Sequence, residues 1–310
     1  MDAGLRERQR HTPHPLERLF ASRQWGRLPG ARRRDNLMDW QESPAPRAGQ
    51  PDASREMAGI SAAPSPCYTM LVRCGRQRDV TGHMTDPIII AGHSHVGALI
   101  GRATKGDCFL QPVEGHERIF GLQGPFPRTL NYWRALKRFA PGHSIALLWG
   151  GNQHNTLFLV EQPLRFDLLP RALQSLPVDE DAVIVPETLV RAKFRTLLGD
   201  RHEGGLHDLF TDLKAQTRSR IALVGTPPPP VSNSHRQVGL TPPAIRLKLW
   251  HVLKEIYQEE AERYGVEFIA IPDNVTDESG FLKQEFWTED VTHANPAYGR
   301  VMLDRLAQEL

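Results

Sequence analysis

From residue 84 onward, short apolar runs rich in β-branched residues alternate with longer segments that have amphipathic helical spacing. The apolar runs predict strands at 87–91, 144–149, 220–225 and 267–271, with weaker candidates near 108–110 and 182–185. The amphipathic segments predict helices at 96–103, 128–139, 187–198, 206–216, 242–264 and 296–310. Such alternation favours an α/β fold in which helices cover both faces of a parallel sheet.

Residues 1–85 have a different pattern, with no sustained apolar periodicity after Trp40. The first lysine of the chain is Lys105, whereas arginine, proline, glycine, serine and alanine are frequent before it. We therefore expect a disordered Arg/Pro-rich segment at 1–85 and a folded domain at 86–310, because such a segment buries too little apolar surface to offset chain entropy. Its arginines would also suit an acidic partner, a nucleic acid or an organellar address. A natural start at Met84 is a further possibility.

Composition narrows the class of protein. The 310 residues carry a formal net charge of +2, which gives no field strong enough to indicate nucleic-acid binding. No apolar run approaches the roughly 20 residues that span a bilayer, so we expect no membrane partner. The three cysteines cannot form a disulfide framework, and a reducing, cytoplasmic location is the expectation.

Ser94 is the first candidate for chemistry. The apolar run that begins at Pro87 stops at Gly92, and Ser94 then stands between His93 and His95 where a helix is predicted to begin. A serine at a strand-to-helix junction lies at the carboxyl edge of a parallel sheet, where α/β enzymes keep their active sites. Backbone N–H groups at a helix start also favour negative charge. The alternative is that Ser94 only caps the helix.

Two later segments supply complementary side chains. The run at 144–149 ends in Gly150-Gly151-Asn152, and Asp290 precedes His293 by three residues near the C-terminus. A carboxylate at that spacing can hold an imidazole in one tautomer and leave its Nε2 free as a base. Taken singly, Asn152 could be a turn residue and His293 a packed core residue.

The ordered set resembles the SGNH (GDSL-like) hydrolase superfamily from residue 86 to the end. Gly92-His93-Ser94 is similar to the first block of that family, Gly150-Gly151-Asn152 to the third and Asp290 to His293 to the last. The chain departs from the pattern at His93, where the family usually has Asp. The second block is either Gly121 or Gly124, and we prefer Gly124.

This resemblance implies a three-layer α/β/α sandwich with a mostly parallel, flavodoxin-like sheet of about five strands. It also implies an ester hydrolase in which Ser94 is the nucleophile, His293 the base and Asp290 its orienting acid. The Ser94 N–H, Gly124 and Asn152 would form the oxyanion hole. We further expect His154 and Asn155 to bind substrate, which would be a small-molecule or carbohydrate ester, with no cofactor and no metal.

Two other classes stay open. His93 and His95 form a His-x-His pair that, with His154, Asp290 and His293, could serve a metal-dependent hydrolase. Alternatively, the chain could be a non-catalytic binding module with the SGNH fold. The sequence does not distinguish hydrolysis from acyl transfer, and it does not indicate an oligomeric state.

Overall fold

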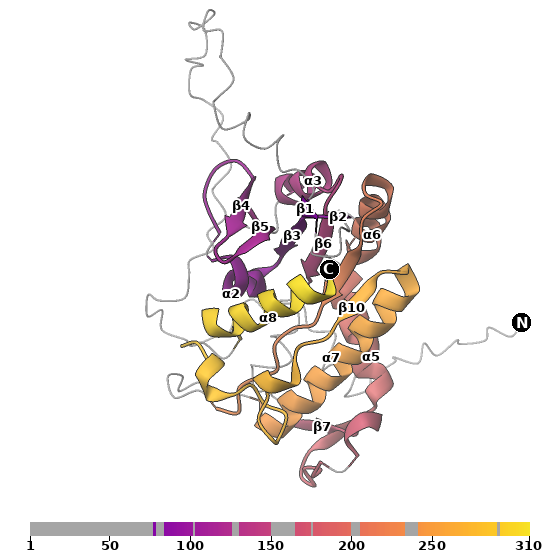
Figure 1. Ribbon diagram of the computed structural model, residues 1–310. Helices are drawn as coiled ribbons and strands as arrows, with labels where there is room; N and C mark the ends of the chain where they lie inside the picture. The colour runs from indigo at the N-terminus through magenta and orange to yellow at the C-terminus, as the bar shows by residue number, and fades with distance from the viewer. Residues whose placement is uncertain are drawn as a thin grey trace, which may run out of the picture. The chain divides into compact units, whose positions relative to one another are not determined.

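The computed structural model describes residues 77–78, 84–101, 103–125, 130–149, 165–174, 176–199, 205–232, 241–289 and 292–310 (Figure 1). All of them belong to one compact unit, Arg76–Leu310. The short strands β1 (Gln77–Arg78) and β2 (Met84–Thr85) pair in antiparallel fashion at its start. Most of the segment 1–85 lies outside the described residues, so its predicted disorder and the domain boundary at 86 stay predictions.

A six-stranded sheet forms the centre of the unit, in the order β10-β9-β6-β3-β5-β4. Five of its strands are parallel, and β4 is antiparallel to β5 at one edge. Numbered along the chain, the parallel strands lie in the order 2-1-3-4-5, which is the flavodoxin-like order. The prediction of about five mostly parallel strands is therefore confirmed. The strands are β3 (Ile88–Gly92), β4 (Phe109–Val113), β5 (His116–Gln123), β6 (Ser144–Leu148), β9 (Ile221–Val224) and β10 (Glu267–Ile269).

Helices cover both faces of this sheet. The chain crosses from β3 to β5 in one direction and makes all later crossovers in the other, so right-handed connections place α2 on one face and α3, α5, α6 and α7 on the opposite face. The last helix, α8, packs against α2 and β5. The helices are α2 (Gly97–Ile100), α3 (Leu130–Phe139), α5 (Glu187–Gly199), α6 (Gly205–Gln216), α7 (Pro243–Tyr264) and α8 (Pro296–Glu309). None of the helices in the described part of the chain is long and apolar enough to cross a bilayer.

Three of the predicted strands form the buried interior, and all residues of β3, β6 and β9 are buried. Predicted strands β4 and β10 lie at the edges of the sheet and are only partly buried. Strand β5 was not predicted because its first half, which begins His116-Glu117-Arg118, is polar and only its second half is buried. A turn at Gly115, whose φ is 79°, joins it to β4 as a hairpin. The small parallel pair of β7 (Phe166–Leu168) and β8 (Val183–Val185) lies outside the main sheet, and β7 was also missed.

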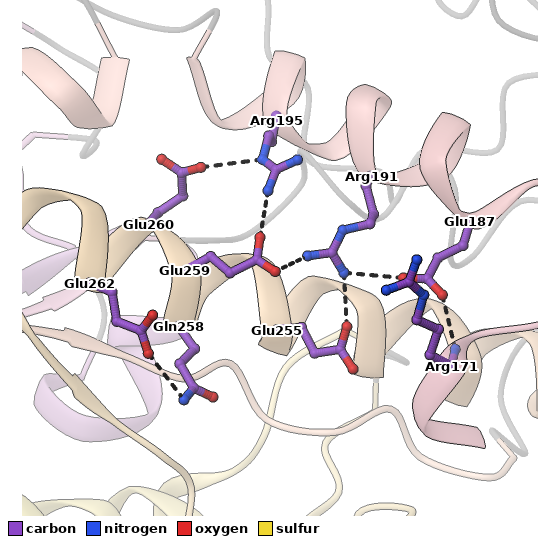
Figure 2. A network of polar contacts seen from close by, with 9 residues as sticks. All are labelled: Arg171, Glu187, Arg191, Arg195, Glu255, Gln258, Glu259, Glu260 and Glu262. Carbon is purple, nitrogen blue, oxygen red and sulfur yellow. Dashed lines mark hydrogen bonds and ion pairs between the residues drawn. The ribbon is translucent and has the colours of Figure 1, made fainter.

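Two polar features attach α7 to its surroundings. The fully buried Lys248 ammonium donates to both carboxylate oxygens of Asp167 and to the Pro177 carbonyl, each at 2.9 Å, which ties α7 to β7. On the outer side, Arg191 and Arg195 of α5 form ion pairs with a row of glutamates on α7, as Figure 2 shows. Because the buried ammonium has three acceptors, its desolvation is compensated. The outer pairs are partly exposed and contribute less.

Candidate active site

The turn that carries Ser94 follows the central strand of the sheet. β3 ends at Gly92, and Ser94 is the first residue of a short 3-10 helix, η3 (Ser94–Val96), which leads into α2. On one side of β3 lies β5 and on the other β6, and the chain leaves β3 and β6 in opposite directions. This point at the carboxyl edge is the topological switch point, where open α/β sheets bind their ligands. Ser94 is half-buried there.

Gly92 lets the ends of β3 and β6 approach closely. Its φ is 156°, and an added Cβ would lie 2.2 Å from the carbonyl oxygen of Leu148 on β6. The His93 N–H donates to that same oxygen at 3.0 Å. Since any side chain would collide with this backbone atom, glycine is required at the first position of the Gly-His-Ser turn.

The two histidines that flank Ser94 contact different side chains. His93 is buried, and its ring centroid lies 4.8 Å from that of Trp149 and 5.5 Å from that of Trp133. His95 is also buried, and its ring centroid lies 5.3 Å from that of His293, with 54° between the ring planes. The structure therefore places the imidazole of His293 beside the residue that follows Ser94.

His293 lies on the loop between the 3-10 helix η6 (Gln284–Phe286) and α8. Its carbonyl oxygen accepts a hydrogen bond from Thr288 Oγ1 at 3.0 Å, and Trp287 and Ala294 form an antiparallel bridge across the loop. The residue as a whole is half-buried. Its predicted partner, Asp290, lies outside the described residues, as do Asn152, His154 and Asn155.

The two glycines considered for the second block occupy different positions. Gly121 lies inside β5, where it pairs with Ile90, and a Cβ there would lie 2.7 Å from the Ile100 side chain of α2. Gly124 is buried and directly follows β5 at the carboxyl edge of the sheet. An added Cβ at Gly124 would likewise lie 2.6 Å from Cys108 Sγ, so close packing accounts for glycine at both positions. Of the two, Gly124 is the one beyond the end of β5, at the same edge as Ser94.

The His-x-His alternative can be compared with these contacts. Across the described ranges, no group of three or more His, Cys, Asp or Glu side chains is arranged to hold a metal ion. The rings of His93 and His95 have different neighbours, the first among tryptophans and the second at His293. His154 and Asp290, the remaining members of that candidate set, are not among the described residues.

Sequence reasoning missed two residues near this edge. The Tyr132 hydroxyl lies between the ends of β3 and β5, where it accepts from the Gly92 N–H at 3.2 Å and donates to the Leu122 carbonyl at 3.4 Å. The second residue, Arg246 of α7, is buried and donates to the carbonyls of Thr241, Pro230 and Val231. Burial lowers the pKa of Arg246 to about 10, so the guanidinium is still a cation at neutral pH. Both residues lie on the buried face of a helix, and the sequence spacing of such a face does not predict which backbone groups their side chains bond.

No protein-family description and no curated protein matches the sequence. Solved structures that match include phospholipase A1 from Streptomyces albidoflavus NA297, at 14% identity and a TM-score of 0.40, over 73% of this chain and 99% of that one. An acetylxylan esterase from Geobacillus stearothermophilus matches at 13% identity and a TM-score of 0.37, over 72% and 93% of the two chains. The lipase/acylhydrolase from Enterococcus faecalis matches at 13% identity and 0.36, over 73% and 95%.

At TM-scores below 0.5, the fold assignment rests on the strand order of this chain itself. That order places Ser94 at the switch point, and the contact of His95 with His293 joins the first and last sequence blocks. This strand order is the flavodoxin-like order that the resemblance of the sequence to the SGNH (GDSL-like) hydrolases implies.

Proposed function

We propose that the protein is a serine hydrolase that cleaves a carboxylic ester. The observation that carries this proposal is the 5.3 Å contact between the rings of His95 and His293, because it brings a candidate base to the turn that begins at Ser94. A serine hydroxyl is a weak nucleophile at neutral pH and needs a base within reach. The same turn lies at the edge where α/β enzymes bind substrates.

In the proposed reaction, Ser94 Oγ attacks the acyl carbonyl while His293 takes the hydroxyl proton. The resulting tetrahedral intermediate expels the alcohol, which leaves with the proton that His293 returns to it. Water then attacks the acyl-enzyme with His293 again as the base, which releases the acid and restores the serine. Asp290 would orient His293 and stabilise its imidazolium form.

The oxyanion of the intermediate needs preorganised donors. We assign this role to the backbone N–H groups of Ser94 and Gly124 and to the side-chain amide of Asn152. The first two follow β3 and β5, which are neighbours in the sheet. One such donor typically accounts for about 3 kcal/mol of the barrier. His154 and Asn155 would line the substrate pocket, and O-acyl groups on carbohydrate are one candidate substrate.

The test compares Ser94→Ala with Ser219→Ala. Ser219 is a partly buried serine that precedes β9 and so lies at the opposite, amino edge of the sheet, where its hydroxyl donates to Asp86 at 2.5 Å. On a panel of nitrophenyl esters and acetylated sugars, Ser94→Ala should lower turnover by about 10⁴-fold or more and abolish labelling by a fluorophosphonate. Ser219→Ala should keep both.

Wild-type turnover in Ser94→Ala would contradict the proposal. Loss of activity on chelation, together with insensitivity to fluorophosphonate, would instead favour the metal-dependent reading of the His-x-His pair. Turnover of esters without labelling of Ser94 would remove the serine from the mechanism.

A further inference from the structure

The hydroxyl of Tyr132 joins two strands at the candidate active-site edge. Tyr132 projects from α3 and is 2% exposed, so its hydroxyl has no access to bulk water. It accepts from the Gly92 N–H of β3 at 3.2 Å and donates to the Leu122 carbonyl of β5 at 3.4 Å. A single oxygen atom therefore bridges the backbones of neighbouring strands.

This bridge begins where the backbone pairing of the two strands ends. The parallel register of β3 and β5 runs from Ile88 opposite Ile119 to Ile90 opposite Gly121. Gly92 and Leu122 lie just beyond the last of these pairs, so the tyrosine hydroxyl takes the place of a missing backbone contact. On its other side, β3 stays paired with β6 as far as Gly92 opposite Leu148.

We propose that Tyr132 is a positioning residue that sets the spacing of the two backbone donors of the oxyanion hole. The Ser94 N–H lies two residues after Gly92, and the Gly124 N–H lies two residues after Leu122. Each donor thus follows closely on a backbone group that the hydroxyl holds. This inference rests on the proposed function, since it assigns no contact between Tyr132 and substrate.

The environment of Tyr132 suits this role. Burial raises the pKa of its phenol, so the hydroxyl stays protonated at neutral pH and can donate and accept together. The ring makes an edge-on contact with Trp133 at a centroid distance of 5.0 Å, which limits its movement. Oxyanion donors stabilise a transition state only when they are fixed in place before the reaction, and small displacements weaken them.

Tyr132→Phe tests the inference, because it removes the bridging oxygen and keeps the ring. We expect kcat on a nitrophenyl ester to fall by about 10- to 100-fold while KM stays within about twofold, since only the transition state carries the oxyanion. The rate of labelling by a fluorophosphonate should fall in parallel. Tyr264→Phe is the matched control. Tyr264 ends α7 just before β10, so it lies at the amino edge, and its kcat should equal that of the wild type.

To distinguish positioning from a purely structural role, kcat is calculated per molecule of folded protein. The assays are run well below the thermal unfolding midpoint of each variant. If Tyr132→Phe does not fold in buffer, sucrose favours the compact state, and all proteins are then compared in that solution. Wild-type kcat in Tyr132→Phe, alongside an inactive Ser94→Ala, would overturn the inference and leave the proposed function intact. An active Ser94→Ala would instead overturn the proposed function.

Discussion

The side-chain amide of Asn295, two residues after His293, both accepts and donates hydrogen bonds. Its Oδ1 caps α8 by accepting from the N–H groups of Ala297 and Tyr298 at 2.9 and 3.2 Å. Its Nδ2 donates to the carbonyls of Glu285 and Trp287 at 2.7 and 3.1 Å. One amide thus attaches the loop that bears His293 to the start of α8.

We predict that Asn295→Ala destabilises the protein by about 2–3 kcal/mol, because a lost cap costs about 1 kcal/mol and two lost hydrogen bonds add roughly 1 kcal/mol each. Asn295→Ser keeps a capping oxygen but has no amide donor, so about 1 kcal/mol of that loss should return. Urea unfolding measures both variants. Equal unfolding free energies for the serine and alanine variants would show that the cap contributes nothing.

The sequence predicts the capping role of Asn295 but not the hydrogen bonds that its Nδ2 donates. Asparagine before Pro296 is the usual residue pair at a helix start, since asparagine caps and proline fits the first turn. The acceptors of its Nδ2 are the carbonyls of Glu285, in η6, and Trp287, just after it, and no local spacing in the sequence predicts that these groups come close to Asn295. The same holds for Tyr132, whose two partners come from two other strands.

Among the elements, α2 and α8 approach each other most tightly at Gly299. An added Cβ at this position of α8 would lie 1.8 Å from the Ala98 carbonyl oxygen and 3.2 Å from Leu99 Cα. Because α2 follows Ser94 and α8 follows His293, this contact holds together the two segments that carry the proposed nucleophile and base. A glycine inside a helix costs about 1 kcal/mol relative to alanine unless packing requires it, as it does here.

Gly299→Ala should therefore destabilise the protein by about 1–3 kcal/mol, because backbone atoms of α2 must move to admit the methyl group. Gly97→Ala is the matched control on α2. Gly97 has a helical φ of −59°, and its added Cβ would meet no atom within 4 Å. That substitution should be neutral or stabilise by up to about 1 kcal/mol. Chemical unfolding compares the two, and a Gly299→Ala variant as stable as Gly97→Ala would contradict the close packing.

The elements that could be predicted are those with one strong periodicity. The fully apolar runs of β3, β6 and β9 and the amphipathic helices all lie within a few residues of the predicted ranges. The sequence pattern did not predict strand β5 because its first residues, 116–118, are polar. These residues lie in the hairpin with β4 and extend past the part of β5 that pairs with β3. Its position beside β3 nevertheless decides where Gly124 lies, so the strand that the sequence pattern did not predict supports the second of the proposed oxyanion donors.

For the whole molecule, strand order determines which edge of the sheet carries the candidate active site. The sequence pattern predicted parallel strands with their carboxyl ends at one edge, and the observed order shows that Ser94 follows the central strand at the switch point. Local patterns do not contain that order, because it depends on which strands pair across long separations. The contact of His95 with His293 likewise needs α8 to pack beside α2.

The pH dependence of global stability can be predicted from His251 of α7. Its pKa is lowered from 6.5 by partial burial and by the positive charge of Lys254. The folded state therefore resists a proton that the unfolded chain accepts at about pH 6.5, so this group destabilises the fold as pH falls below that value. Above pH 6.5 the imidazole is neutral in both states and has no such effect.

We expect His251→Gln to change this profile in a defined direction. Relative to the variant, the wild type should lose unfolding free energy between pH 7.5 and pH 5.5, because only the wild type gains a proton at this position on unfolding. Denaturant titrations of both proteins across that range provide the difference, which cancels the contributions of the other histidines. Lys254→Gln should reduce the difference, since it removes one of the two causes of the lowered pKa. A difference that is constant with pH would show that His251 binds protons equally in the folded and unfolded states.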